Sequence, residues 1–458
     1  MPMWSCVADA CKKPAVQRDG DCLLCDKHFC RAHLRQPWHS CPKPEDDWES
    51  YSRQYTATEA SHIDNLRRRI DGSKLCSRAS MLRNGISCTV DLSPKHLSAM
   101  MGNQNCHAEI IFEDGVKWLA RFRLPRTTSP PQEVRDFILH SEVATMSYLQ
   151  QHTRLPTPKI FDWACESDPG NQLGVSYILM EKLDGRPLDW QTASSSQREK
   201  IMQQLVDVFL EIDKHPFESM GSLTMSNSVP GSFDMQGFAQ QSTYWMGAGR
   251  GLGPFSSPLD GYRAIVESNL SMIASGELAA YYPLEAYLTH RFRLDVIGSL
   301  WKDISSRSQF FLKHPDDKGD HILVNDTFDI VGIIDWEWTC VVSRAEAFSS
   351  PLMMWPVTKF YNSLNELSPD ELRFAEIFRE RGRQDLSDCI LDGRKIQRFL
   401  FALGLETPRD ERTIIDLFKG LQRAFGYEDE AWQVWKYKVL KEWKDDKLLQ
   451  ILLEPSEN

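Results

Sequence analysis

Nine cysteine and histidine side chains lie within the first 41 residues, and eight of them stand at the short intervals that are typical of metal ligands. Thiolate sulfur and imidazole nitrogen are the ligands that Zn²⁺ prefers, and four of them complete one tetrahedral structural site. The number of ligands is therefore enough for two zinc ions. A segment this short has too little apolar surface to fold alone, so bound metal would supply the folding free energy. The candidate ligands are Cys6, Cys11, Cys22, Cys25, Cys30, His33, His39 and Cys41.

A second group of reactive side chains is acidic and lies in the C-terminal half of the chain. A loop with Asp316 and Asp320 precedes an apolar strand, a turn at Asn325-Asp326, and a second apolar strand that ends in Asp335 and Glu337. This hairpin would bring two sets of carboxylates to one site. Carboxylate oxygen suits Mg²⁺ that bridges nucleotide phosphates. The stretch therefore predicts a magnesium-dependent phosphate site.

The segments that must position these side chains begin with a predicted hairpin. Strand-like runs over residues 108–112 and 116–124 flank Asp114-Gly115, which is a strong hairpin signal. Arg121 and Arg123 lie two residues apart in the second strand, so they share one face of it. This face is a candidate for contact with an anion.

Helical and strand patterns alternate after this hairpin, and helices then dominate. A helical pattern over residues 134–150 carries Glu142, a strand-like run covers residues 176–181, and long helical patterns start near residue 197. The order predicts an α+β fold with a small lobe built on an antiparallel sheet and a larger helical lobe.

The composition is that of a folded intracellular protein. The 458 residues carry a net charge of −11, which argues against nucleic acid as a partner and suits a cationic or neutral small substrate. No run approaches the length of a membrane span, and the first residues lack a secretory signal. Twelve cysteines in a reducing compartment favour metal ligands and buried thiols over disulfides. We expect a cytoplasmic location, and the basic triplet Arg67-Arg68-Arg69 leaves a nuclear one open.

The N-terminal spacing resembles the AN-one type of zinc finger, in which the ligands of two metal ions interleave. Protein ligands would fill both sites and leave no open position for catalysis, so the implied role is structural. The finger would present a docking surface for a protein partner. His28 is a spare histidine that we expect to be solvated. Carried over by position, the resemblance implies one zinc on Cys6, Cys11, Cys30 and His33, and a second on Cys22, Cys25, His39 and Cys41.

The acidic stretch and its surroundings resemble the aminoglycoside phosphotransferase family, relatives of choline kinase and the protein kinases, in the form found in filamentous fungi. The resemblance covers about residues 95–345 and implies a two-lobed, protein kinase-like fold. The catalytic loop of that family reads His-x-Asp, then four residues and Asn. By position, Asp316 would accept the proton of the acceptor hydroxyl, His314 would brace the loop and Asp335 would bind magnesium.

The same resemblance implies a set of nucleotide-binding residues. Glu142 would pair with a phosphate-contacting cation at Arg121, with Arg123 as an alternative register. One loop would cover the phosphates, and backbone groups of the hinge over residues 177–185 would meet adenine. The positions are Gly102, Asn103, Gln104 and Asn105 in the loop, and Glu181 and Leu183 in the hinge.

Several positions depart from the family pattern or stay open. His321 stands where Asn would coordinate a second magnesium, and because imidazole is a softer ligand, Asp320 is the alternative. Arg121 replaces a lysine and keeps its charge with a different geometry. Glu337 is left open between a metal ligand and a partner for an arginine. Gly102 is the single glycine of the covering loop.

The resemblance implies an ATP-dependent kinase that uses Mg²⁺, or Mn²⁺, to phosphorylate a hydroxyl group of a small molecule. The alternative is a pseudokinase, a nucleotide-binding scaffold that the zinc finger recruits to a protein partner. The presence of both Asp316 and Asp335 favours the enzyme. A nucleic-acid regulator has least support, because no basic stripe follows the finger. The acceptor stays open among an antibiotic, a choline-like amine, a sugar and a fungal metabolite.

The patterns also suggest where the parts of the chain begin and end. An insert from about residue 188 to residue 300 is expected to form the acceptor pocket with Phe233, Met235, Phe238, Tyr244, Trp245 and Met246. The expected segments are the finger (1–45), a linker with a helical extension (46–94), the small lobe with its hinge (95–185), the larger lobe with the catalytic loop (186–350) and C-terminal helices (351–458).

Overall fold

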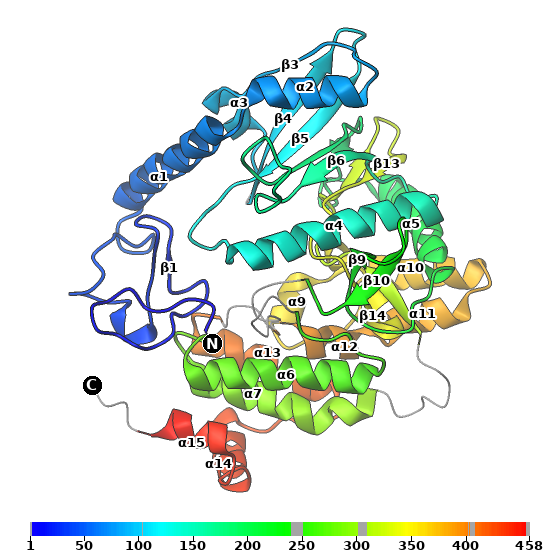
Figure 1. Ribbon diagram of the computed structural model, residues 1–458. Coiled ribbons are helices and arrows are strands. Elements are labelled where there is room, and N and C mark those ends of the chain that lie inside the picture. Colours follow the sequence, from blue (N-terminus) through cyan, green and yellow to red (C-terminus); the bar gives the residue numbers. More distant parts are fainter. Residues whose placement is uncertain are drawn as a thin grey trace. The chain divides into compact units, whose positions relative to one another are not determined.

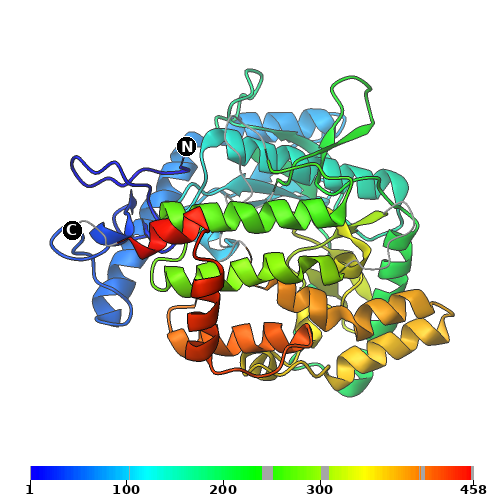
Figure 2. The same cartoon turned by 90° about the horizontal axis from the view of Figure 1, so that it is seen from below.

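The computed structural model describes residues 2–102, 104–239, 251–300, 309–401, 403 and 408–454. Internal contacts divide the chain into two compact units. The sheet unit comprises Met3–Gly185 and Val331–Glu337, and the helical unit comprises Arg186–Ile330 and Trp338–Asn458 with the first two residues. Figures 1 and 2 show the elements of both in two views.

The sheet unit contains the cysteine-rich segment and one five-stranded antiparallel sheet. Its elements are β1 (Asp21–Cys22), β2 (Lys27–His28), the 3-10 helix η1 (Arg31–His33), α1 (Trp48–Arg69), α2 (Gly72–Leu82), β3 (Cys88–Val90), α3 (Pro94–Ala99), β4 (Asn105–Phe112), β5 (Lys117–Arg123), α4 (Gln132–His152), β6 (Ile160–Ala164) and β7 (Tyr177–Glu181). The strand order in the sheet is β3-β4-β5-β7-β6. Strands β1 and β2 form a separate small hairpin.

Alternation of side chains along the strands gives the sheet one apolar face and one charged face. In β4 every second residue from Cys106 to Phe112 is buried. These side chains join Ala120 and Phe122 of β5 and residues of α1, α2 and α3 in one hydrophobic core. Arg121 therefore points to the other face, where it contacts Glu142 of α4. One strand thus borders both the core and the charged face.

The central hairpin and the helix after it agree with the patterns in the sequence. Gly115 has a φ of 85°, a conformation that favours glycine, and the N–H of Phe112 donates to the carbonyl of Val116 at 3.0 Å. Helix α4 follows Pro131 and carries Glu133 in its first turn, where a negative charge is favourable. The expected strands on either side of the turn and the expected helix are all present.

Two segments differ from expectation. The chain near Lys95, where the small sheet lobe was expected to begin, forms α3, because Ser93 caps the helix by accepting the N–H of His96 at 3.4 Å and Pro94 occupies its first turn. Strand β3 belongs to the sheet, although it lies in the segment that was expected to be a linker. The α+β class is unchanged by either difference.

The helical unit combines many helices with short antiparallel strand pairs. Its elements are β8 (Arg186–Pro187), α5 (Ser195–Asp213), β9 (Ser222–Met225), β10 (Phe233–Gln236), α6 (Pro258–Ser275), α7 (Pro283–Val296), η3 (Ile297–Leu300), β11 (Phe310–Lys313), β12 (Ile322–Val324), β13 (Ile330–Ile333, which continues into the sheet unit), β14 (Cys340–Ser343), α8 (Arg344–Ala347), η4 (Leu352–Met354), α9 (Val357–Tyr361), α10 (Pro369–Glu380), α11 (Gln384–Leu391), α12 (Gly393–Leu400), α13 (Glu411–Ala424), α14 (Trp432–Glu442) and α15 (Lys447–Leu453). Strand pairs join β9 to β10, β11 to β14 and β8 to β12. Among the described residues, no helix has the length and apolar character needed to cross a membrane.

Candidate active site and metal centre

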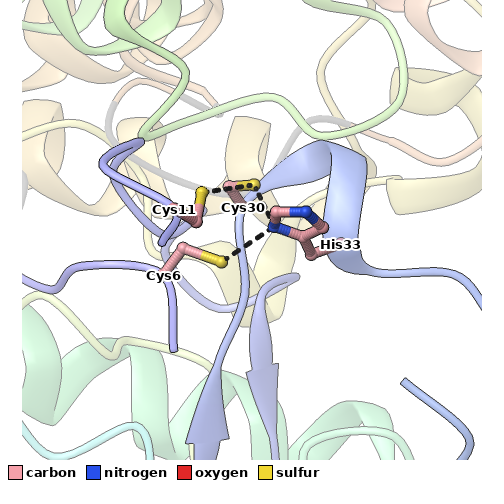
Figure 3. A group of neighbouring side chains, drawn as sticks. All are labelled: Cys6, Cys11, Cys30 and His33. Atoms are coloured by element: carbon pink, nitrogen blue, oxygen red, sulfur yellow. Dashed lines mark hydrogen bonds between the residues drawn. The ribbon is translucent and has the colours of Figure 1, made fainter. Parts of the chain in front are cut away.

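Cys6, Cys11, Cys30 and His33 point toward one another in the N-terminal segment (Figure 3). The Nδ1 atom of His33 lies 3.3 Å from the Sγ atoms of both Cys6 and Cys30, and the Sγ atom of Cys11 lies 3.9 Å from that of Cys30. Zinc bonds of about 2.3 Å to sulfur and about 2.0 Å to nitrogen place tetrahedral ligand atoms about 3.5–3.8 Å apart. The measured spacing therefore fits a tetrahedral zinc site.

A second group contains Cys22, Cys25, His39 and Cys41, whose ligand atoms all lie within 4.8 Å of one another. The Nε2 atom of His39 is buried and has no hydrogen-bond partner in the described part of the chain, while the ring bonds to the backbone of Leu34. A backbone partner on one ring nitrogen commonly orients a histidine whose other nitrogen binds metal. The two groups have the compositions that the zinc-finger resemblance implies.

Two thiols of these groups, those of Cys25 and Cys30, have raised pKa values. Burial and the neighbours Cys22 and Cys41 raise the pKa of Cys25 to about 12, and burial raises the pKa of Cys30 to about 11. A bound cation reverses this effect, because a coordinating thiol loses its proton to the metal. The donor sets therefore suit two Zn²⁺ ions.

The loop between Cys22 and Asp26 is attached to the rest of the sheet unit. The carboxylate of Asp26 lies 2.7 Å from Nε2 of His62 in α1 and accepts a hydrogen bond from the hydroxyl of Thr127, in the loop between β5 and α4. The hydroxyl of Thr58 donates to the carbonyl of Leu24 at 3.3 Å. One side of the second ligand group thus rests on α1 and on the chain that leads into α4.

His28, which we expected to be solvated, belongs to neither ligand group. Its Nδ1 atom lies 2.7 Å from Oδ1 of Asp21, and its ring stacks on Trp4 with centroids 4.9 Å apart. Because Asp21 and His28 face each other across β1 and β2, the contact stabilises that small hairpin.

Arg121 of β5 and Glu142 of α4 form a buried ion pair on the charged face of the sheet. Nη1 of Arg121 donates to Oε1 of Glu142 at 2.6 Å, and Nη2 donates to Oε2. Burial alone would lower the pKa of Arg121, but the charges of Glu142, Glu337 and Asp335 raise it overall. The pair is the one that the family resemblance implies for these two positions.

Arg123, the alternative register, has different partners. It donates to Oε1 of Glu337 and to the side chain of Gln104. The Nδ2 atom of Asn105 donates to Oε2 of Glu337 at 3.0 Å. Both oxygens of Glu337 are thus engaged by protein groups, one of which is the arginine partner considered from the sequence.

These pairs line a pocket of the sheet unit that opens to solvent. Its walls include Asn105, Glu142, Glu337 and both arginines. Asp335 acts electrostatically on Arg121 and Glu142, and its φ of 62° is a strained conformation that is frequent at functional sites. The region thus gathers carboxylates and guanidinium groups, which suit a metal ion and phosphate oxygens respectively.

The covering loop and the hinge are only partly available for a nucleotide. The N–H of Gly102 donates to the carbonyl of Asn105 at 2.9 Å, and Asn103 lies outside the described residues. The N–H of Glu181 donates to the carbonyl of Lys159 at 2.8 Å. Leu183 lies in the irregular segment after β7 and is half-buried. Of the two hinge positions named from the sequence, Glu181 has its amide already engaged.

The acidic loop belongs to the helical unit and follows β11, which is paired with β14. The carboxylate of Asp316 lies 2.9 Å from Nζ of Lys318, and that of Asp320 lies 3.5 Å from it. Burial lowers the pKa of Lys318, but Asp316 and Asp320 raise it overall. The side chain of Asp316 is 38% exposed. Lys318 was absent from the sequence candidates, although the alternation of acidic and basic residues could have indicated it.

Asp317, the neighbour of Asp316, supports the loop instead. Its Oδ1 accepts the N–H of Leu352 at 2.9 Å, and its Oδ2 lies 2.7 Å from Nζ of Lys313. Gly319 has a φ of 113°, which strains any residue with a side chain. These contacts fix the loop while the carboxylate of Asp316 keeps contact with solvent.

His314 and His321 stack in this loop with ring centroids 4.2 Å apart. Burial, followed by the neighbouring charges of His314 and Lys313, lowers the pKa of His321 well below its usual range, so its ring is neutral. Its Nδ1 atom is buried and lacks a hydrogen-bond partner within the described ranges. A neutral imidazole with such a nitrogen can bind a metal ion, whereas Asp320 is turned toward Lys318.

The aromatic insert expected to form the acceptor pocket is described only in part. Phe238 is buried, and Phe233 and Met235 are half-buried in β10. Tyr244, Trp245 and Met246 lie outside the described residues.

The sequence profile of the phosphotransferase enzyme family (APH) matches residues 113–359, more than half of the chain. The match includes β5, α4, the acidic loop and the segment with Asp335 and Glu337. Together with the antiparallel sheet and the helical unit, it confirms the kinase-like α+β fold class expected from the sequence.

Curated relatives match over short stretches. Two strains of Aspergillus fumigatus each have a subtelomeric hrmA-associated cluster protein that is 32% identical over 103 residues, 22% of this chain and 19% of theirs. The altered inheritance of mitochondria protein 9 of Candida glabrata is 26% identical over 125 residues, 23% of this chain and 19% of that one. The chain thus spans 19% of the length of these relatives.

Several solved structures resemble the chain over most of its length. The GDP complex of a mutant aminoglycoside 2′-phosphotransferase-IIIa is 15% identical and covers 83% of this chain and 100% of its own, with a TM-score of 0.42. A putative aminoglycoside phosphotransferase from Ralstonia eutropha is 14% identical, covers 79% and 100%, and has a TM-score of 0.45. The Plasmodium vivax ethanolamine kinase is 14% identical, covers 74% and 82%, and has a TM-score of 0.41. Because these scores are low, family membership rests on the profile match.

Proposed function

The chain belongs to the phosphotransferase enzyme family, and we propose that it transfers the γ-phosphate of ATP to a hydroxyl group of a small molecule. The observation that carries the proposal is the pocket of the sheet unit, lined by the Arg121–Glu142 and Arg123–Glu337 pairs. Phosphoryl transfer depends on positioning and on neutralising phosphate charge. Buried guanidinium groups near the charge of Asp335 suit that task.

Asp316 is the residue we assign to the acceptor hydroxyl. The hydroxyl oxygen bonds to the γ-phosphorus, the bond from that phosphorus to the bridging oxygen breaks, and ADP leaves. The hydroxyl proton passes to Asp316, whose carboxylate is exposed, whereas Asp317 is occupied by Leu352 and Lys313. Lys318, with its Nζ atom 2.9 Å away, holds the Asp316 carboxylate in position.

Asp335, in the sheet unit, is the residue we assign to one metal position, and His321, in the helical unit, is our candidate for another. A bound Mg²⁺ would supply positive charge that offsets the negative charge developing on the phosphate. His321 offers an orphaned buried nitrogen, while Asp320 is paired with Lys318, so we favour His321 for the second position. Because imidazole suits Mn²⁺ better than Mg²⁺, we expect Mn²⁺ to support the reaction at least as well.

The test is ADP release from the purified chain with ATP, either metal, and a panel of amino-containing and hydroxylated acceptors, including cationic ones. We expect acceptor-dependent release that Asp316→Asn abolishes while ATP binding by calorimetry stays nearly unchanged. Asp326→Asn is the matched control, because it makes the same change at an exposed position of the same hairpin. Turnover that survives Asp316→Asn would remove Asp316 from the mechanism.

The second candidate is a nucleotide-binding scaffold without turnover. It is favoured by the engagement of both Glu337 oxygens and by Arg121 in place of a lysine, since each reduces the resemblance to an active site. Saturable ATP binding without ADP release for any acceptor, in either metal, would favour this function over the kinase.

We propose that the N-terminal segment is an AN-one-type zinc finger that docks the chain onto a protein partner. The two four-ligand groups support this assignment, and neither leaves an open position for catalysis. Elemental analysis should find two zinc ions per chain, and replacing Cys25 with Ser should reduce this to one. A zinc-free chain with an unchanged fold would rule the finger out.

A further inference from the structure

A second pocket lies in the helical unit among α7, α12 and α13 and opens to solvent. Its lining includes His290, Arg293 and Arg398, and no lining residue belongs to the acidic loop. The proposed phosphoryl transfer uses none of these side chains. Their surroundings differ from those of the arginines in the sheet unit.

Arg293 is 4% exposed and contacts only neutral acceptors among the described residues. Its Nε donates to the carbonyl of Phe399 and its Nη2 to that of Phe401, each at 2.7 Å. Its Nη1 donates to Nδ1 of His290 at 2.8 Å. Burial lowers the pKa of Arg293, and burial with the charge of Arg293 lowers that of His290, which is therefore neutral.

Arg398 is 2% exposed and is also without a carboxylate partner in the described part of the chain. Its Nε donates to Oδ1 of Asn365 at 2.7 Å, and its Nη2 donates to the carbonyls of Phe360 and Leu364. Its Nη1 is buried and has no hydrogen-bond partner there. One edge of the guanidinium group is therefore unused.

The charges around Arg398 add to this imbalance. Burial, then the charges of Arg394 and Arg423, lower its pKa. Arg394 and Arg423 each have a carboxylate of their own, in Glu371 and Asp429. Hydrogen bonds to carbonyls satisfy donors but do not neutralise charge, and a buried charge is costly without a counter-ion. The pocket therefore carries two buried positive charges for which the described residues supply no negative one.

A ligand could supply the missing negative charge, and the other lining residues indicate the chemistry of the rest of that ligand. Phe401, Ile414, Leu417 and Phe418 form an apolar wall. A guanidinium fork matches the paired oxygens of a carboxylate or phosphate group. We propose that this pocket binds a small molecule with one oxyanion group and an apolar body. The oxyanion contacts the guanidinium groups, and the body packs on the apolar wall.

Four probes of equal chain length test the proposal on the full zinc-loaded chain by calorimetry. Octanoate and octyl phosphate carry the oxyanion, 1-octanol is neutral, and octylamine is cationic. We expect at least one oxyanion probe to bind saturably, and about tenfold or more tighter than octanol and octylamine. Whether octanoate or octyl phosphate binds better identifies the oxyanion. Equal binding of octanol, or no binding of either oxyanion probe, would overturn the proposal.

A variant pair tests the location of this site. Thr289 lines the pocket from α7, so Thr289→Glu places a carboxylate beside the arginines, and Thr289→Gln is the uncharged control of similar size. We expect Thr289→Glu to weaken oxyanion binding about tenfold or more and to raise the melting temperature, whereas Thr289→Gln changes binding by less than about threefold. Equal effects of the two variants would place the oxyanion elsewhere. ADP release, measured in parallel, should not respond to either variant.

Discussion

The pocket of the sheet unit and the second pocket, in the helical unit, bury arginine in opposite ways. In the sheet unit, Arg121 and Arg123 each contact a carboxylate, in Glu142 and Glu337. In the helical unit, the arginines of the second pocket contact carbonyls, an amide and a neutral imidazole within the described ranges. The first arrangement neutralises charge inside the fold, and the second satisfies hydrogen bonds but leaves the charge uncompensated.

The difference teaches that hydrogen bonding and charge balance are separate requirements. A guanidinium group can have most of its donors satisfied and still lower the stability of the fold. Neutral acceptors replace the hydrogen bonds to water, but they do not compensate the positive charge as water or a counter-ion would. A balanced pair therefore needs no further counter-ion. An unbalanced arginine attracts an anion continuously.

The largest effect is expected when the carboxylate partner of a buried arginine is removed from the sheet unit. Glu142→Gln leaves the buried guanidinium of Arg121 without its bidentate partner, and we expect a loss of about 3–5 kcal/mol in the free energy of unfolding. Urea denaturation measures this loss. Glu133→Gln, at an exposed position of the same helix, should change stability by less than about 0.5 kcal/mol.

The double variant Arg121→Met with Glu142→Leu completes that experiment. Because it removes both charges together, it should recover most of the loss. A double variant as unstable as Glu142→Gln would mean that the pair contributes packing rather than charge balance.

A smaller effect is expected when a charge is removed from the helical unit. Arg293→Gln loses hydrogen bonds to the carbonyls of Phe399 and Phe401 but leaves no carboxylate unpaired, so we expect a cost of about 1–2 kcal/mol. Arg291→Gln on the same helix, which removes a partly exposed pair with Asp295, should cost less than about 1 kcal/mol. If Arg293→Gln costs as much as Glu142→Gln, the two units do not differ as described.

The smallest expected effect is a pH-dependent loss of stability at His321, whose buried imidazole is neutral. His321 has a pKa lowered well below the unfolded value of about 6.5, so its contribution to stability is present above that pH and is lost as the pH falls below it. Between pH 7.5 and 5.5 the loss attributable to His321 should reach about 1.4 kcal/mol. His321→Asn should lack it. Parallel denaturation curves for the two proteins at both pH values would contradict this assignment.

Local signals in the sequence predicted the elements that carry the proposed site. Asp114-Gly115 between two strand-like runs located the hairpin of β4 and β5, and a periodic apolar pattern located α4 with Glu142. These signals act over few residues, so they do not depend on the tertiary fold. The family match over residues 113–359 then confirmed the class of fold that they indicated.

Features that depend on distant contacts were not predictable in this way. The pairing of Arg123 with Glu337 joins residues 214 positions apart, and the sequence left the role of Glu337 undecided. Arg293 and Arg398 lie on helices α7 and α12. Because a charged residue on a helix is ordinarily exposed to solvent, the neighbouring sequence did not indicate that they are buried. The helix α3 was missed because its capping residue, Ser93, precedes a very short apolar pattern.

Asp26, which joins the loop of the second ligand group to His62 and Thr127, has a thermodynamic consequence for the sheet unit. Thr127 belongs to the connection that delivers Glu142 to Arg121. If zinc orders that connection, the metal and the nucleotide stabilise one shared conformation, and each must increase the affinity of the other by the same factor. The availability of zinc would then change the affinity of the chain for a nucleotide.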